Sequence, residues 1–385
     1  MPVYDYIIIG AGASGLLLGD AIGSDSFFNN KSVLILEKSG KTTNDRTWCF
    51  WERGNGPFDD ILFKKWSKIH FEGNHLNIKP EITPYSYKML RGIDFYQHYL
   101  ARLKPYPNVT IAYDSIESVI EEASEVKVTG KKASYQAKQV FDSRFDYKKL
   151  KCESNYPVLQ QHFVGWFIKT EHPAFDAQAP TFMDFSIPQK GNTRFMYVLP
   201  LSDKEALLEY TLFSENTLEK EAYEKAIQDY ISQKLNIDSF EITEKEQGNI
   251  PMTCYDFTQE NTNRILKIGM AGGWAKASTG YTFYSSFKKV NQLVTHIKKG
   301  KPLKTFGKKS RFWFYDLLLL DILQKSNHLG GFIFESLFKK RKPQLIFKFL
   351  DEDTHILEEV YIMAAPKPWP FIKALLGRLF SSTGP

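Results

Sequence analysis

The fold is decided by the N-terminal stretch Tyr4-Asp-Tyr-Ile-Ile-Ile-Gly10-Ala-Gly12-Ala-Ser-Gly15, which the apolar run Leu16-Leu-Leu18 follows. A short β-branched run, a glycine turn and an apolar segment, in this order, predict a buried strand that leads directly into a helix. Gly10 permits the turn, Gly12 lets backbone amides approach a pyrophosphate, and Gly15 lets the helix pack closely on the strand. The stretch predicts a dinucleotide-binding fold; the alternative is a tight turn in an unrelated α/β domain.

A carboxylate follows at the position expected for such a fold. The second predicted strand, Ser32 to Leu36, is followed by Glu37. At this spacing a carboxylate accepts a hydrogen bond from a ribose hydroxyl, whereas a basic residue accommodates a 2′-phosphate. We therefore expect FAD or NAD, in preference to NADP, as the ligand of this domain.

The rest of the chain departs from the strand–helix alternation of a plain dehydrogenase. Alternating apolar and polar residues predict many short strands and only one helix before a buried strand returns at Arg264 to Met270. The expected strands are Val109 to Tyr113, Ile116 to Ile120, Val126 to Thr129, Ala133 to Ala137, Gln161 to Ile168, Thr181 to Phe185, Arg194 to Leu199, Leu207 to Phe213 and Ile242 to Gln247, and the expected helix is Leu218 to Leu235.

This order predicts an α/β fold in which a β-rich segment interrupts a nucleotide-binding domain. We assign residues 1–155 and 250–300 to a discontinuous Rossmann-like domain and residues 156–249 to a β-rich substrate domain. Residues 301–385 form a helical, basic C-terminal region. A chain of 385 residues suits one large domain or two interleaved ones.

Charge and aromatic content are the unusual features of the composition. Residues 296–385 hold 16 Lys and Arg against 8 Asp and Glu, a net charge of +8. The whole chain carries +6, so the remaining residues are slightly acidic. Basic runs there alternate with apolar stretches, a mixture that can bind anionic lipid or nucleic acid but also occurs on solvated helices. Aromatic residues make up 15% of the chain, enough to fill a core or to surround a large apolar or cationic guest.

Several classes of protein are disfavoured. The densest apolar run, Leu317 to Leu320, is too short to cross a bilayer, and Asp5 lies where a secretory leader would be basic. We therefore expect a cytoplasmic protein. The three cysteines, Cys49, Cys152 and Cys254, have no paired spacing, so we expect neither a disulfide framework nor a metal site.

The chain resembles the flavin-dependent lycopene cyclases, which are related to flavoproteins of the hydroxybenzoate hydroxylase and geranylgeranyl reductase type. The resemblance covers residues 4 to about 290 and is looser beyond. It rests on the glycine turn and on Asn44-Asp-Arg-Thr-Trp-Cys-Phe-Trp51, Tyr87-Lys-Met-Leu-Arg-Gly-Ile-Asp-Phe95, Phe141-Asp-Ser-Arg144, Gln161-His-Phe-Val-Gly-Trp166, Leu207-Leu-Glu-Tyr-Thr211 and Gly269-Met-Ala-Gly-Gly-Trp-Ala-Lys-Ala-Ser-Thr-Gly-Tyr281.

The resemblance implies a set of cofactor-binding residues for FAD. Besides the glycine turn and Glu37, these are Arg46, Arg91, Asp142, Gly269, Thr279 and Gly280. Met270 stands where many relatives carry an Asp that binds ribitol, and the cyclase branch shares this departure. Without the family, the two arginines could be surface ion-pair partners, and Asp142 could simply close a turn.

Glu209 is the most informative single residue, because it lies inside the apolar run Ala206-Leu-Leu-Glu-Tyr-Thr-Leu-Phe213. Alternation places it on one sheet face with Leu207 and Thr211. A carboxyl in a strand interior is either paired, with Arg194 as the candidate partner, or kept protonated by burial. The resemblance favours the second alternative, since the cyclases carry an essential acid at the matching position.

The resemblance therefore implies an isomerase or intramolecular lyase that closes the ends of lycopene to β-ionone rings without net redox change. Its cofactor is FAD in the reduced form, with NAD(P)H as electron source, and its partners are a linear carotene and a membrane surface that it binds peripherally, with no nucleic acid and no metal. The rival is a FAD-dependent hydroxylase or a prenyl-chain reductase of the same fold.

Overall fold

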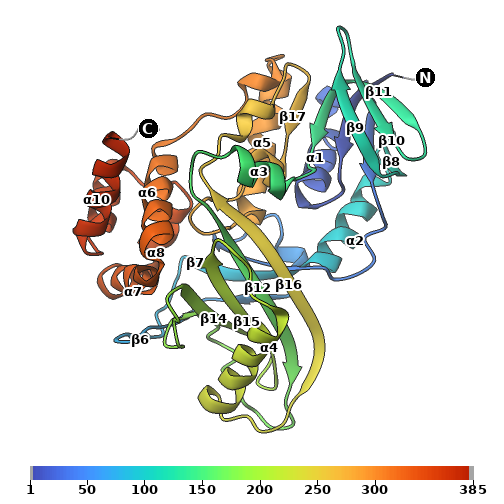
Figure 1. Cartoon of the computed structure of the whole chain (residues 1–385). Coiled ribbons are helices and arrows are strands. Elements are labelled where there is room, and N and C mark those ends of the chain that lie inside the picture. The colour runs from blue at the N-terminus through green and yellow to red at the C-terminus, as the bar shows by residue number, and fades with distance from the viewer. Residues whose placement is uncertain (1–2, 381–385) are drawn as a thin grey trace.

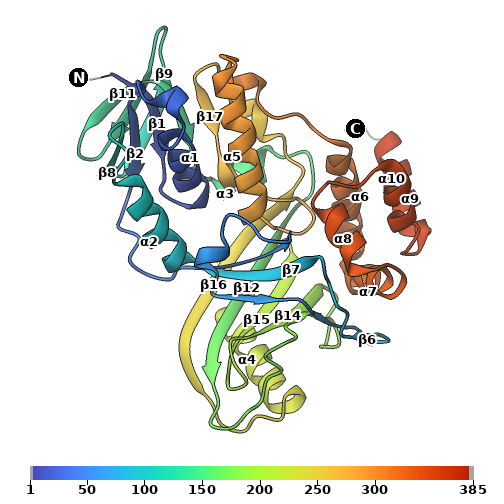
Figure 2. The same cartoon turned by 180° about the vertical axis from the view of Figure 1, so that it is seen from behind.

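The computed structural model describes residues 3–380 and builds them around three sheets (Figures 1 and 2). The first is a mixed sheet of seven strands in the order β8-β2-β1-β11-β10-β9, with β17 also paired to β11. Its strands are β1 (Val3–Ile9), β2 (Val33–Glu37), β8 (Val109–Tyr113), β9 (Ile116–Glu121), β10 (Val126–Gly130), β11 (Ser134–Asp142) and β17 (Ile265–Lys267).

The first sheet is parallel from β8 through β1 to β11 and on to β17, because each of these strands returns through a crossover. The opposite faces of β1 enter different clusters: Ile8 lies with the helices α1 (Ala13–Gly23), α2 (Gly92–Leu103) and α5 (Phe283–Lys298), whereas Ile7 and Ile9 face β10 and β11. Burial on both faces explains why β1 and β2 are almost continuously apolar.

The second sheet also has seven strands, in the order β16-β12-β15-β14-β13-β5-β6, and is antiparallel except between β13 and β5. Its strands are β5 (His70–Glu72), β6 (Asn77–Ile78), β12 (Val158–Lys169), β13 (Thr181–Asp184), β14 (Thr193–Pro200), β15 (Glu205–Ser214) and β16 (Glu241–Thr253). A third sheet joins β3 (Thr47–Arg53), β7 (Tyr85–Arg91) and β4 (Lys64–Trp66).

The second sheet has two different faces. Helix α4 (Lys220–Asp229) and the π-helical turn Tyr230–Lys234 cover one of them through a cluster that includes Trp166 and Leu208. The alternate residues, such as Phe167 and Leu207, face the third sheet and the C-terminal helices. Glu209 lies on this second face, because it has the same alternation as Leu207 and Phe213 along β15.

The C-terminal helices form a separate layer, drawn in orange to red in Figures 1 and 2. The leucine run of α6 (Arg311–Ser326) divides between two contacts: Leu317 and Leu320 face the second sheet, and Leu318 packs near α10 (Pro368–Leu379). The helices are α3 (Tyr147–Glu153) earlier in the chain and α6 (Arg311–Ser326), α7 (Gly330–Lys340), α8 (Pro343–Leu350), α9 (Ile356–Met363) and α10 (Pro368–Leu379) here. Among the described residues, none of the helices combines the length and the apolar character that a bilayer crossing requires.

The α/β architecture with C-terminal helices confirms the predicted fold class. The predicted strand Ile242 to Gln247 is too short, because β16 continues to Thr253. The predicted helix Leu218 to Leu235 is too long, because α4 gives way to a π-helical turn at Tyr230. Strands β5 and β6, only three and two residues long, join the second sheet unpredicted, since so few residues carry no periodicity.

Candidate active site

The glycine turn between β1 and α1 has the backbone geometry that the sequence predicts for a phosphate-binding turn. Gly10 has a φ of +98°, and Glu37 Oε2 accepts the amide of Ala11 at 2.6 Å. A Cβ on Gly15 would lie 1.9 Å from the Gly10 carbonyl oxygen, so only glycine fits there. At Gly12 a Cβ would meet no atom within 4 Å, which leaves open space at the N-terminus of α1.

Asp142 and Gly269 reach the same end of the first sheet. The Asp142 carboxylate accepts the Arg144 amide at 3.0 Å and lies 3.0 Å from Lys267 Nζ. Burial alone would raise the pKa of Asp142, but these neighbours outweigh it and lower the pKa. Gly269 has a φ of +62°, and a Cβ there would lie 2.8 Å from Ser14 Oγ on the first turn of α1.

The remaining predicted cofactor residues lie between the first and second sheets. Arg46 pairs with Asp45 at 2.9 Å and is half exposed, and Arg91 Nη2 lies 3.6 Å from Glu244 Oε2. Gly280 has a φ of +69° and touches the second sheet, because a Cβ there would lie 2.2 Å from the side-chain oxygen of Gln161. Helix α5 begins at Phe283, three residues after Gly280.

These residues fit a flavin dinucleotide. The buried polar atoms that make no hydrogen bond within the described residues include Arg91 Nε, Gln161 Oε1 and Thr279 Oγ1. Buried polar groups are normally paired, so unmet donors and acceptors beside an open glycine turn suit a ligand with polar ring edges. Among residues 3–380, no three His, Cys, Asp or Glu side chains gather as metal ligands would.

Glu209 is not alone on its sheet face. In the register of the sheet, Gly165 on the central strand β12 pairs with Glu209 of β15 on one side and with Glu246 of β16 on the other. A Cβ on Gly165 would lie 3.1 Å from Glu246 Cγ and 2.9 Å from a methyl group of Leu207. Because Gly165 has no side chain, the two carboxyl groups can approach each other across β12.

The two carboxyls shift each other's titration. Burial and, next in importance, the negative charge of Glu246 raise the pKa of Glu209 to about 8. Burial likewise raises the pKa of Glu246 to about 7. Thr211 donates to Glu209 at 2.7 Å, and Thr47 donates to Glu246 at 2.7 Å. The pair therefore holds a proton at neutral pH.

The alternative prediction, that Glu209 pairs with Arg194, is wrong. Arg194 pairs in register with Leu212, not with Glu209, and its guanidinium donates to the Tyr210 hydroxyl at 2.9 Å and to Asn192 at 2.8 Å. Alternation explains the error, since even-numbered residues of β14 face α4 while Glu209 faces the opposite side. The sheet neighbour of Glu209 on β14 is Tyr197.

An apolar cavity of about 100 Å³ runs from the site into the C-terminal helices. Thr279 and Tyr281 line it on the side of the site, its walls include Phe182 and Leu318, and residues of α9 and α10 also line it. Tyr281 stands beside Tyr197 and Glu209, and burial raises the pKa of Tyr281 and Tyr197 well above the ordinary value. Neutral aromatic rings therefore separate the carboxyl from the apolar cavity.

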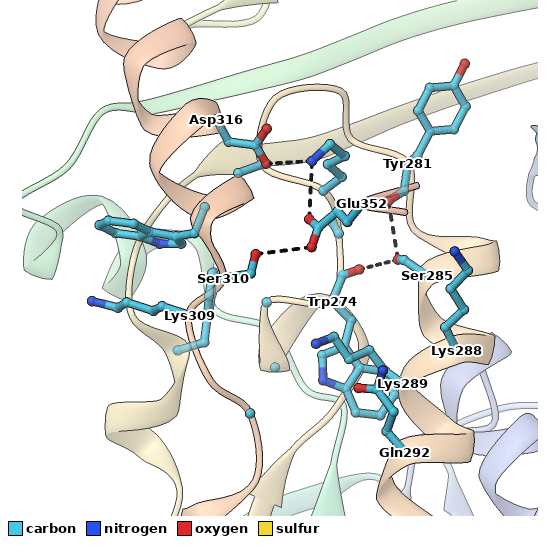
Figure 3. Close-up of a pocket in the computed structure, with 18 of the residues that line it drawn as sticks. Trp274, Tyr281, Ser285, Lys288, Lys289, Gln292, Lys309, Ser310, Asp316 and Glu352 are labelled. Atoms are coloured by element: carbon cyan, nitrogen blue, oxygen red, sulfur yellow. Dashed lines mark hydrogen bonds and ion pairs between the residues drawn. The ribbon is translucent and has the colours of Figure 1, made fainter. Parts of the chain in front are cut away.

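A polar cleft of about 420 Å³ reaches Tyr281 from another direction (Figure 3). The buried ammonium of Lys276 lies 3.1 Å from Asp316 and 3.3 Å from Glu352, and Ser310 donates to Glu352 at 3.2 Å. Figure 3 shows Lys288 of α5 across from these groups. The polar cleft and the apolar cavity thus meet at the same tyrosine.

Glu246 was not among the predicted site residues. Its strand was expected, but Glu244 and Glu246 alternate as they would on a solvated face, and nothing local indicates which strand lies beside them. The available signal was the glycine at 165 within an otherwise bulky strand, because an isolated strand glycine often marks a close approach of other groups.

Comparison with known proteins gives a consistent result. The chain is 24% identical over 300 residues to lycopene beta-cyclase of Pantoea ananas, a match that covers 73% of this chain and 71% of that protein. A geranylgeranyl bacteriochlorophyll reductase-like protein of Thermoplasma acidophilum has a TM-score of 0.61 at 11% identity, covering 98% of this chain and 99% of that one. A mutant of the halogenase PltM in complex with FAD has a TM-score of 0.57 at 12% identity, covering 97% and 86%.

The two structures establish a shared fold, and the sequence match is more specific. The sequence model of the family described as lycopene cyclase protein matches residues 5–376, nearly the whole chain. The chain therefore belongs to the lycopene cyclase family.

Proposed function

We propose that this protein closes the linear ends of lycopene to β-ionone rings by an acid-initiated reaction without net redox change. The carrying observation is Glu209, a buried carboxyl whose pKa is raised to about 8 and which lies near Tyr281, a residue that lines the apolar cavity. Protonation of an isolated double bond needs an acid that still holds its proton at neutral pH and is kept from water.

Glu209 begins the reaction by donating its proton to the terminal trisubstituted double bond. An O–H bond breaks, a C–H bond forms, and the resulting tertiary cation adds to a neighbouring double bond to close the ring. A C–H bond of the ring then breaks, so the formula of the carotene is unchanged. The ring faces of Tyr197 and Tyr281 beside the carboxyl stabilise positive charge and exclude water.

We propose FAD as the cofactor, held at Gly10, Gly12, Gly15, Glu37, Asp142 and Gly269 through its phosphates and sugars, with Arg46, Arg91, Thr279 and Gly280 near its ring. The support is the open space at Gly12 and the unmet polar atoms of Arg91 and Thr279. When bound in its reduced form, FAD supplies an electron-rich ring near the cation. NAD(P)H is the proposed electron source.

We also propose that the carotene enters from a membrane surface. Large apolar side chains are exposed on α9 and α10, where the apolar cavity ends: Leu357 is 77% exposed and Trp369 is 69% exposed. Lys339 lies in the last turn of α7, and Lys342 is the N-cap of α8. Contiguous apolar surface beside cations is typical of a site that binds an anionic lipid surface.

The function is tested by incubating the purified protein with lycopene and reduced FAD without oxygen. We expect a product of unchanged mass with the absorption spectrum of a cyclised carotene. Glu209→Gln should lower the rate at least about 100-fold while FAD remains bound. A hydroxylated product, or one that has gained the mass of two hydrogens for each reduced double bond, would instead establish the rival oxidoreductase.

A further inference from the structure

We propose that Glu246 is a positioning residue that acts through Glu209: the two carboxyls share one proton, and the charge of Glu246 holds that proton on Glu209 until the substrate takes it. The proposal rests on the proposed function for its chemistry. The sharing itself is a property of the protein without substrate and is tested separately.

The strand register supports the sharing. Two acidic residues on opposite neighbours of one strand are normally separated by the side chain between them, but here that residue is Gly165. A Cβ at this position would press on Glu246 Cγ at 3.1 Å. The glycine therefore keeps clear the space through which the carboxyls of Glu209 and Glu246 approach each other.

The hydrogen bonding of Glu246 indicates where the proton lies. Its Oε2 accepts from Thr47, but its Oε1 is buried and accepts from no other group in the described residues. The neighbour on that side is the Glu209 carboxyl, which with its proton can supply the missing donor. Two carboxylates held together in a water-poor site retain one proton between them.

The charges around the pair do not neutralise it. Glu246 itself is only 6% exposed. Arg46 is the nearby cation, but its guanidinium pairs with Asp45 and is half exposed. The other titratable or polar groups that face the pair are Glu244 on β16, Thr47 and Cys49 on β3, Thr211 on β15, Tyr197 on β14 and Tyr281 before α5. None of these other groups is a cation. The carboxyl pair with its one proton therefore keeps one net negative charge before the reaction.

This arrangement suits a cation-forming reaction. When Glu209 gives up its proton, the pair carries two negative charges close to the new carbocation, and their mutual repulsion favours recovery of a proton. The C–H bond that breaks in the ring can return that proton to the pair. The O–H bond is then restored, and neither oxidant nor reductant is needed.

The sharing is tested by nuclear magnetic resonance titration of the protein labelled with ¹³C at glutamate carboxyls, without lycopene. In wild type, Glu209 and Glu246 should titrate as a coupled pair near neutral pH. In Glu246→Gln, the pKa of Glu209 should fall by roughly one unit or more, because the repelling charge is gone. Glu241→Gln, an exposed change on the same strand, should leave it unmoved.

A Glu209 pKa that stays unchanged in Glu246→Gln would overturn the proposal and leave Glu246 a packing residue. If that variant does not fold, Gly165→Ala serves instead, since a methyl group there displaces Glu246 and should lower the Glu209 pKa in the same direction. The alkaline limit of cyclase activity should move down with it. Coupled titration in a protein that forms no rings would overturn the proposed function but not the sharing.

Discussion

A carboxyl that keeps its proton in the folded state makes stability depend on pH. The pKa of Glu209 is raised from 4.5 to about 8 and that of Glu246 to about 7. Between pH 4.5 and about 8 the folded protein binds more protons than the unfolded chain, so the free energy of unfolding falls as the pH rises. This part of the stability is fully present below 4.5 and is lost by about 8.

Replacing Glu209 by Gln should therefore stabilise the protein increasingly as the pH rises from 4.5 to about 8. We expect the midpoint of thermal unfolding of Glu209→Gln to exceed that of wild type above pH 8 and to equal it in acid below the ordinary carboxyl pKa. Scanning calorimetry across this range measures the difference. A difference that is independent of pH would show that Glu209 titrates normally.

Two glycines of the turn should respond differently to the same substitution. Gly12 has φ −78° and ψ −172°, which valine tolerates, and no atom lies where its Cβ would be. Gly12→Val should fold normally but bind FAD more than about tenfold more weakly, because the side chain occupies the phosphate site. Gly15→Val should instead destabilise the fold, since its Cβ would overlap the Gly10 carbonyl oxygen.

Equilibrium FAD titration and thermal unfolding together separate these effects. Retention of wild-type FAD affinity by a folded Gly12→Val protein would place the cofactor elsewhere.

Sequence reasoning located this turn because its chemistry lies within a few consecutive residues. It did not locate Glu246, because the contact with Glu209 depends on the pairing of β12 with two strands that are distant in sequence.

Among the elements, the proposed membrane surface combines exposed apolar residues of α9 and α10 with the basic run at the end of α7. The basic run at the end of α7 is partly used inside the protein: Lys340 donates to the Ala365 carbonyl at 2.7 Å, and Arg341 stacks on Tyr361 at 3.7 Å. Neutralising these two would loosen α7 from α9. Lys339 and Lys342 are therefore the better probes of the electrostatic contribution.

We expect Trp369→Ser with Leu357→Ser to weaken vesicle binding at every salt concentration. Lys339→Gln with Lys342→Gln should weaken binding to anionic vesicles only in low salt, at about 1 kcal/mol per charge. Ile120→Ser is the matched control, because Ile120 is 55% exposed on β9, far from α10 in Figure 1. Sedimentation with anionic and neutral vesicles measures both effects, and equal loss in the control would argue against a membrane face.

The elements that could be predicted are the long periodic ones. The apolar strands of both large sheets show a clear alternation or a continuous apolar run, and this is why their positions agree with the structure. The π-helical turn after α4 could not be predicted, since it continues a helical sequence pattern. Strand β5 joins the second sheet through its parallel pairing with β13, a hundred residues later, and its other neighbour is the two-residue strand β6.

For the whole molecule, the proposed reaction moves protons and consumes no electrons. In deuterated water, each ring formed should gain one deuterium, because the carboxyl pair exchanges with solvent before it donates. Many rings should form per nicotinamide oxidised. Mass spectrometry of the product, with nicotinamide absorbance followed in parallel, measures both ratios. One nicotinamide oxidised per double bond lost would contradict the cyclase.

The strand order also constrains how the chain can fold during its synthesis. Strand β1 pairs with β11. The last residues of β11 also pair with β17, which ends at Lys267 and is therefore made much later. Until that residue has been made, the nucleotide-binding sheet has an open edge, although its glycine turn was made near the start. Long-range parallel pairing is slow, and unpaired edges attract other chains. A chain interrupted before β17 should therefore aggregate. The first sheet can be completed only after synthesis has reached β17, its last strand in the sequence.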